Sequence, residues 1–512
     1  MENTLYDYAD FKRQPGNWSR GSNSDSRSTD RTCHYFQIPA YQSGEYNLRK
    51  DHQRKFRNLV RCEVTIYLSL VFFLLLSFIT AMMESASVQM AKNYRRADTN
   101  RAIECVFAEY QKELLEEYDI FALEGSYETG AYSEQNVEDR LSYYGAGNME
   151  HEVERIQLLT DQGGKTFYEQ AVIYMEHKYG IDLVKNMLGT SSLWKNQEEK
   201  AEEYVREEDE SQKKLENLLA EQDGQLLEEN NPIEHVETLK QSSLLELVVP
   251  KGVKLSEKCV SPGEMLSNRE RQTGYGSFAD EEEEYSKASE LLFGEYLQEH
   301  FSSFTDQIQR GALDYELEYI LAGKESDRQN LEDTVKQLLF LRFVPNYAYL
   351  QTDTAKKAEA EALAGTLCTL LTVPAITEAA AQAILLAWAY GETIMDIRSL
   401  LAGKKVPVAK SETTWQLSLS SLLTLGTGND TKEGMDCEEG MDYQEYLRIL
   451  LFLKEKDTLT IRALGIIEQN LRSIYGQDYF RADYCISRLE LHTTCSLRRG
   501  IRYDFKTYYS YQ

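Results

Sequence analysis

The sequence lacks the short motifs by which many enzymes and cofactor-binding proteins are recognised. It contains no glycine-rich phosphate loop, no His-Glu-x-x-His, no Gly-x-Ser-x-Gly and no dinucleotide-binding fingerprint. Its seven histidines are scattered, and none has a second histidine at metal-ligand spacing. We therefore expect no enzyme activity, no cofactor and no metal site, although a catalytic group assembled from distant residues would leave no motif.

Cysteine is scarce, with eight residues in a chain of 512 and no Cys-x-x-Cys pair. This number is too small for a disulfide scaffold. Cys485 and Cys495 fall in one predicted strand, about 33 Å apart at roughly 3.3 Å per residue, so they should not bond to each other within one chain. The other cysteines that follow the hydrophobic run described below could pair after export, and the sequence leaves their partners open.

Positive charge is also scarce, because 56 Lys and Arg stand against 84 Asp and Glu, a formal net charge of −28. Nucleic-acid binding needs clustered Lys and Arg to neutralise phosphates, so we expect no nucleic-acid partner. One basic cluster stands directly before the single long hydrophobic run, where a nearby membrane explains it better. Its members are Arg49, Lys50, Arg54, Lys55, Arg57 and Arg61.

The single long hydrophobic run covers residues 64–83 and holds no charged side chain. At 1.5 Å per residue, a helix of this length spans about 30 Å, the thickness of the hydrocarbon core of a bilayer. A helix in the core of a soluble protein normally has a polar side, and this segment has none. We predict a single-pass anchor in the cell membrane, with the lipid bilayer as its partner. The predicted anchor residues are Val64, Leu68, Phe72, Leu75, Ile79 and Met83.

The run is longer than the apolar region of a cleaved signal, about 7–15 residues, and Ser85-Ala86-Ser87 is a poor cleavage site. We therefore expect the anchor to be retained. More Lys and Arg precede the run than closely follow it, which places the N-terminus in the cytoplasm and the bulk of the chain outside the cell. Residues 1–61 show no periodicity and are predicted to form a disordered cytoplasmic tail.

A helical pattern continues beyond the run. Six apolar positions at spacings of 4, 3, 4, 4 and 3 residues mark one face of a helix that extends the anchor outward. This face packs either on the protein's own domain, which is the simpler interpretation, or on a neighbouring subunit, which would allow a homo-oligomer. The six positions of this predicted partner helix face are Ile103, Phe107, Tyr110, Leu114, Tyr118 and Phe121.

The rest of the chain divides by composition into further parts. Residues 84–229 are interpreted as a membrane-proximal helical region, with a strongly acidic helix or short coiled-coil hairpin over 197–229. Residues 230–279 contain several prolines and glycines and are predicted to form a linker. Residues 280–475 are predicted to form a helical domain.

One part of this helical domain, "PAITEAAAQAILLAWAYGETIMDIRSLLAG", resembles a second membrane span in composition. Its longest uncharged run is about thirteen residues, a length typical of a buried core helix. Glu392 and Asp396 lie one helical turn apart and could share a cation. Because no histidine or third carboxylate stands at helical spacing, we interpret them as a surface pair.

The chain ends with a different period. Apolar residues alternate with polar ones over 489–497 and again over 501–511, on either side of "RRG". Alternation on both sides of a short turn predicts a β-hairpin, placed within 476–512. The fold class is therefore predicted to be mainly α with a small C-terminal sheet, an α+β arrangement with an N-terminal transmembrane helix.

Several stretches resemble an uncharacterised family of single-pass membrane proteins of Firmicutes. They include "EVTIYLSL", "MMESA", "AEYQKELLEEYDIFAL" and "AILLAWAYGETIMDIRSLLAGKKVPVAK", and the resemblance runs from Glu63 to the C-terminus. Members of that family tend to accompany tight-adherence (Flp-type) pilus gene clusters. The resemblance implies a place in the cell envelope, with other envelope or pilus assembly proteins as partners.

The context has a distant likeness to the TadE/TadG-like pseudopilins, which carry a small residue before the apolar helix and a glutamate five positions into it. Here Cys62 and Tyr67 stand at those places, which argues against processing by a prepilin peptidase. The leading hypothesis is a non-catalytic, membrane-anchored accessory protein of a pilus or secretion apparatus. The alternatives are a minor pilin-like subunit built into a fibre and an exported enzyme of unrecognised type.

Overall fold

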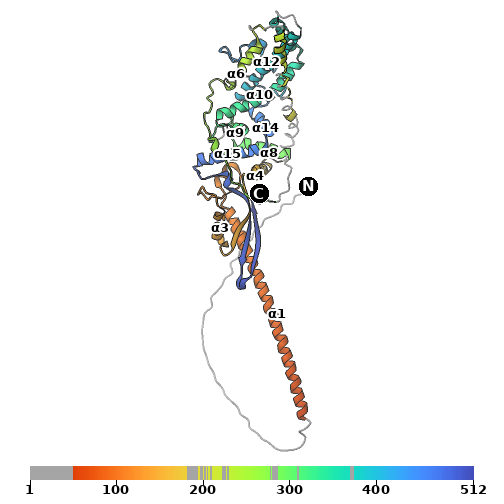
Figure 1. Ribbon diagram of the computed structural model, residues 1–512, viewed down its shortest axis with the longest axis vertical. Coiled ribbons are helices and arrows are strands. Elements are labelled where there is room, and N and C mark those ends of the chain that lie inside the picture. Colours follow the sequence, from red (N-terminus) through yellow and green to blue (C-terminus); the bar gives the residue numbers. More distant parts are fainter. Residues whose placement is uncertain are drawn as a thin grey trace, which may run out of the picture. The chain divides into compact units, whose positions relative to one another are not determined.

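A computed structural model of the chain describes residues 50–180, 230–276, 278, 286–307, 311–368 and 374–511, together with short stretches between 194 and 227 (Figure 1). The chain divides into two compact units, Met1–Glu84 and Ser85–Gln512, called unit 1 and unit 2 below and described separately. The predicted disordered tail lies outside the described residues as far as residue 49. From Lys50 onward that segment is helical, which differs from the prediction.

The first helix, α1, runs from Lys50 to Phe107. Neither proline nor glycine occurs within these bounds, so nothing in the backbone chemistry interrupts the helix. The prediction of one helix continuing to Phe121 is wrong, because α1 ends at Phe107 and a separate helix, α2, covers Lys112–Tyr118. Helix α2 ends where Asp119 adopts a left-handed conformation with φ of 54°.

The sheet of unit 2 has four strands, β1 (Leu123–Glu124), β2 (Glu150–Leu158), β3 (Cys485–Ser496) and β4 (Arg502–Ser510). Strand β3 is central and pairs antiparallel with each of the others. The hairpin of β3 and β4 confirms the predicted C-terminal hairpin.

Strand β2 was not predicted. Its register against β3 shifts twice, between Val153 and Arg155 and between Gln157 and Leu158. These irregularities break the two-residue alternation by which a strand is recognised from sequence. The buried apolar residues are consequently Val153, Ile156 and Leu158 rather than every second position.

The sheet packs on the part of α1 that belongs to unit 2 (Figure 1). The Tyr511 hydroxyl donates a hydrogen bond to the carbonyl of Phe107 at 2.5 Å. The Phe107 ring contacts the rings of both Tyr509 and Tyr511, with centroids 4.4 and 5.1 Å away. Helix α3 (Glu134–Leu141) contributes Val137 and Leu141 to this core, and the Ser133 side chain caps its N-terminus.

A larger core lies among helices that come between β2 and β3 in the chain. Helix α12 occupies its interior and packs against both α10 and α11, so that apolar residues on all its sides are buried. The helices are α4 (Asp161–Tyr179), α8 (Lys287–His300), α9 (Glu316–Ala322), α10 (Asp327–Thr352), α11 (Thr354–Leu367), α12 (Pro374–Leu401), α13 (Leu419–Leu422), α14 (Tyr443–Leu453) and α15 (Lys456–Tyr475). Single turns are η1 (Ser142–Ala146), η2 (Pro262–Glu264), η3 (Ala482–Tyr484) and η4 (Arg498–Gly500).

The prediction of a linker and loops over 230–279 is wrong for residues 232–248, whereas the described residues from 249 to 276 are mostly irregular. Residues 232–248 contain helices α6 (Pro232–Gln241) and α7 (Leu244–Val248), both packed against α12. Pro232 begins α6 instead of breaking it, because a missing N–H costs nothing in the first helical turn. Further along, Arg269 bonds to the buried carboxylates of Glu468 and Asp483 at 2.8 and 2.7 Å.

Of the predicted acidic helix over 197–229, the structure describes residues 200, 203, 206–207, 210–221 and 226–227, and those up to 221 are helical. Leu215 is buried in the large core.

We predict that Phe107→Ala destabilises unit 2 by about 3–5 kcal/mol, because it removes a buried ring that packs against two others. Chemical denaturation of the purified chain in detergent, followed by tyrosine and tryptophan fluorescence, measures the free energy of unfolding. Tyr94→Ala is the matched control, since the Tyr94 side chain is 65 % exposed on the same helix. Equal stability of the two variants would contradict the packing described here.

Candidate functional site

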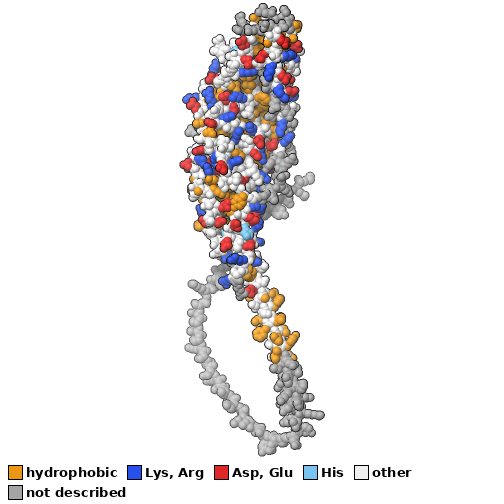
Figure 2. Space-filling view, in the orientation of Figure 1, with side chains coloured by type: hydrophobic (Ala, Val, Ile, Leu, Met, Phe, Trp, Pro, Cys, Tyr) orange, Lys and Arg blue, Asp and Glu red, His pale blue; other side chains and the backbone are white. Residues whose placement is uncertain are grey.

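The apolar side chains of unit 1 lie on the outside of their helix. The six predicted anchor residues, from Val64 to Met83, are between 51 % and 69 % exposed. Figure 2 shows these apolar side chains covering the helix. An uninterrupted apolar surface is unfavourable in water, where monomeric proteins seldom expose large apolar patches. Among the described residues, this is the one helix long and apolar enough to cross a membrane.

Three hydroxyl groups in this segment donate to carbonyls of the same helix. Ser69 donates to the carbonyl of Ile66. Ser77 donates to the carbonyl of Leu74, and Thr80 donates to the carbonyl of Leu76. All three hydrogen bonds measure 2.8 Å. Hydrogen bonds of this kind suit a polar side chain in hydrocarbon, where no water is available as a partner. The segment is therefore chemically compatible with a bilayer along its whole length.

The predicted partner helix face is not a free surface. Ile103 and Phe107 are buried in the sheet core. Leu114 and Tyr118 are buried in the helical core. Tyr110 remains 37 % exposed and meets the half-buried Phe121 ring at a centroid distance of 5.2 Å. The simpler of the two interpretations holds for the four buried residues, which stabilise their own unit and are unavailable to another subunit.

The interpretation of Glu392 and Asp396 as a surface pair is wrong. Both side chains are fully buried on α12 and share a buried lysine, Lys410. The Lys410 ammonium lies 2.6 Å from Glu392 and 2.7 Å from Asp396. The buried Arg342 guanidinium of α10 lies 2.8 Å from the second oxygen of Asp396. These four residues, called the buried quartet below, contain two cations and two carboxylates.

Further donors complete the quartet. The backbone N–H groups of Gln416 and Leu417 donate to Glu392 at 2.9 and 2.8 Å. The Asn346 amide donates to Asp396 at 3.0 Å. Arg342 also donates to the Tyr446 hydroxyl at 2.9 Å. The network thus joins α10, α12, α14 and the segment around residues 410–417.

The pKa values follow from this arrangement. Burial raises the pKa of Glu392 to about 7, although Lys410 opposes the change. Burial alone would also raise the pKa of Asp396, but the positive charges of Arg342 and Lys410 hold it below its ordinary value. Since the four side chains have no exposed surface, they cannot reach a substrate. We assign the buried quartet to the architecture of the unit.

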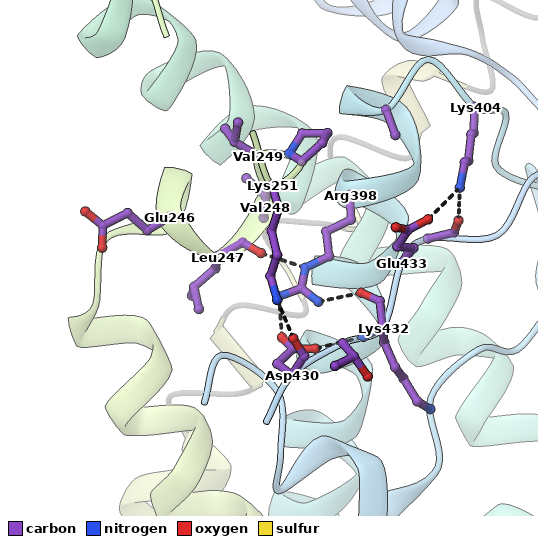
Figure 3. Close-up of a pocket in the computed structure, with 14 residues that line it drawn as sticks. Glu246, Leu247, Val248, Val249, Lys251, Arg398, Lys404, Asp430, Lys432 and Glu433 are labelled. Carbon is purple, nitrogen blue, oxygen red and sulfur yellow. Dashed lines mark hydrogen bonds and ion pairs between the residues drawn. The ribbon is translucent and has the colours of Figure 1, made fainter. Parts of the chain in front are cut away.

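A pocket of about 260 Å³ lies between the end of α7, the end of α12 and residues 430–434 (Figure 3). Arg398 stands at its centre and donates to the carbonyl of Leu247 and the carboxylate of Asp430, both at 2.6 Å. Lys251 donates to the carbonyl of Asp430 at 2.7 Å. Lys404 donates to the carbonyl of Gly434 at 2.7 Å. These side chains bond to the pocket wall itself and hold its segments together.

The pocket lining carries charged and hydroxyl side chains, among them Thr431, Lys432 and Glu433. Among the residues described, it contains no histidine, cysteine or serine. Elsewhere in the described part of the chain, no three His, Cys, Asp or Glu side chains lie close enough to hold a metal ion. The six described cysteines that follow the hydrophobic run are all free thiols.

Comparison with protein families gives one match. A family of unknown function, DUF5702, matches residues 222–497, which is more than half of the 512 residues. The chain belongs to this family. The DUF5702 region includes α6 to α15, the buried quartet, the pocket and strand β3, and it excludes the apolar segment of unit 1. Comparison with curated proteins gives no match. Comparison with solved structures gives none either.

The sequence showed the two carboxylates of the quartet but not their partners. Lys410 follows Glu392 by 18 residues and Arg342 precedes Asp396 by 54. No local spacing rule connects such positions. A burial signal was nevertheless present, because both carboxylates interrupt a helix whose apolar residues occur on all sides.

We predict that Lys410→Met destabilises unit 2 by about 3–5 kcal/mol, because it leaves two buried carboxylates with one cation. Denaturant titration of the purified chain measures the change. Lys432→Met is the matched control, since Lys432 is exposed on a nearby loop. A loss no larger than that of the control would show that the quartet does not stabilise the fold.

A pH-dependent prediction comes from a different buried carboxyl. Glu318 accepts hydrogen bonds from the Phe304 N–H and the Tyr443 hydroxyl at 2.9 and 2.7 Å, while its other oxygen is buried without a partner. Burial raises the pKa of Glu318 to about 7. The group binds its proton more tightly when folded, so its contribution to stability is complete below about pH 4 and is lost as the pH rises through 7.

We therefore predict that the free energy of unfolding falls less between pH 5 and pH 7 in Glu318→Gln than in the unmodified chain. The difference in this fall should be about 2 kcal/mol. Parallel denaturant titrations at several pH values measure it. If both proteins showed the same pH dependence, Glu318 would not be the titrating group.

Proposed function

We propose that this protein is a single-pass membrane protein whose unit 2 is a non-catalytic interaction domain on the extracytoplasmic side. The observation that carries the proposal is the uncharged, fully apolar and exposed surface of residues 64–83. In a bilayer that surface contacts lipid tails, and the internal hydroxyl bonds of Ser69, Ser77 and Thr80 remain satisfied.

The orientation rests on the flanking charges. Six Lys and Arg lie within about fifteen residues before the segment, and this excess favours a cytoplasmic N-terminus. Unit 2, which follows the segment, would then stand outside the cell.

A role in binding rather than catalysis is supported by how unit 2 uses its polar groups. In the part of the chain that the structure describes, two clusters of charges join segments of the fold: the quartet, and the cluster of Arg269, Glu468 and Asp483. Neither cluster lines the pocket of Figure 3.

The wider context of the proposal is a pilus or secretion apparatus of the cell envelope. It rests on the resemblance of the sequence to Firmicutes proteins of tight-adherence gene clusters. In that context the protein would be an accessory that holds unit 2 at the membrane surface for other assembly proteins.

We predict that Phe72→Arg combined with Leu75→Arg releases the protein from membranes. Each arginine near the centre of a span costs about 2.5–3.5 kcal/mol of insertion free energy. Alkaline extraction of cell membranes followed by centrifugation measures retention. The matched control is Met90→Arg with Tyr94→Arg, which adds the same charge to exposed positions of α1 beyond the segment. Retention of the Phe72 and Leu75 variant in the membrane pellet would refute the anchor.

Two further measurements test the orientation of the chain and whether the segment is retained. Protease added to intact cells should degrade unit 2 and leave the N-terminal peptide protected. Mass spectrometry should find an uncleaved segment. A mature chain that begins at Glu63 would instead indicate a pilin-like subunit.

A further inference from the structure

Five basic side chains gather at one end of unit 2. Three of them lie on α1 and two on the β3–β4 hairpin. This basic patch consists of Lys92, Arg95, Arg96, Arg498 and Arg502. It is unexpected in a chain with a formal net charge of −28.

Packing of the hairpin on α1 brings the patch together. Near the start of β4, the Tyr503 hydroxyl donates to the carbonyl of Lys92 at 3.3 Å. The Lys92 ammonium also lies 5.0 Å from the centre of the Tyr503 ring, and the Arg96 guanidinium lies 5.4 Å from that of Phe505. Tyr511, which follows the other end of β4, bonds to Phe107 at the end of α1. Strand β4 therefore runs along α1, and the hairpin turn lies beside the first turns of α1 in unit 2.

These cations have no carboxylate partners. Within the described part of the chain, none of the five forms an ion pair, whereas the neighbouring Arg101 pairs with Asp98 at 3.0 Å. Like charges that gather without counter-charges repel one another, so the arrangement is complementary to an anionic surface.

We propose that the basic patch binds the anionic headgroups of the same bilayer that residues 64–83 span. This inference rests on the proposed function. Lys92 follows Met83 by nine residues, so at most about 30 Å of chain separates the patch from the end of the span, whatever the arrangement of the two units. Met90, which is 58 % exposed, lies in the chain between the end of the span and Lys92. Tyr94, which is 65 % exposed, lies among the basic residues of the patch. The amphipathic ring of Tyr94 is of a kind that favours the headgroup layer.

The test uses the full chain in lipid nanodiscs made of phosphatidylcholine alone or of phosphatidylcholine with phosphatidylglycerol. Trypsin cleaves after Arg498 and Arg499 in the hairpin turn, and headgroup binding should protect this site. We expect cleavage to be about tenfold slower with phosphatidylglycerol, and high salt should remove the protection. Hydrogen exchange of residues 496–503 should slow in the same discs.

A matched pair of variants distinguishes the patch from general charge. Lys92→Gln, Arg95→Gln and Arg96→Gln together should abolish the protection while leaving the trypsin site intact. Lys324→Gln, Arg328→Gln and Lys336→Gln should preserve it, because these side chains are exposed on and before α10.

Three outcomes would overturn the inference. They are equal cleavage in both kinds of disc, loss of protection in the α10 variant, and equal protection by soluble polyphosphate in discs of phosphatidylcholine alone. Failure of the chain to enter either disc would instead refute the membrane anchor, so the two proposals fail separately.

Discussion

Unit 2 depends on the neutralisation of two carboxylates inside its largest core. Helix α12 is buried on all sides, yet it carries Glu392 and Asp396, and unpaired charges at such positions would oppose folding by several kcal/mol each. Lys410 offsets that cost by pairing with both carboxylates, and Arg342 by pairing with Asp396. Because each cation comes from a different segment, the quartet also fixes where those segments lie. Apolar packing alone tolerates sliding of one helix against another, whereas this network satisfies its charges in one arrangement.

The need of polar groups for partners when they leave water also explains how the two units differ. In unit 2, the best-satisfied buried charges have partners distant in sequence, as with Arg269 and Glu468. In residues 64–83, three hydroxyls are satisfied within about one helical turn and the apolar side chains face outward. These hydroxyls need no polar partner from the rest of the protein. The segment needs only an apolar solvent, which the hydrocarbon of a bilayer provides.

Sequence reasoning succeeded where a signal is local and periodic. The uncharged run, the core helix over 374–401 and the alternation of the C-terminal hairpin were recognised because neighbouring residues determine each pattern. It failed where the structure of a segment depends on contacts with residues distant in sequence. The end of α1 at Phe107 depends on a chain reversal toward β1, so the regular spacing beyond it was misleading. Strand β2 is hidden by two register shifts that only its pairing with β3 reveals. The partners of Glu392 and Asp396 depend on tertiary contacts.

The family match and the sheet together bear on how the chain folds. The matched region, residues 222–497, contains β3 but neither β2 nor β4. Since β3 pairs with strands on both of its edges, a chain limited to that region would expose two rows of backbone hydrogen-bonding groups. Strands from before and after the matched region therefore complete its sheet. One of them, β4, also packs on α1, so the sheet connects the part of α1 that follows residues 64–83 to the family's helical core.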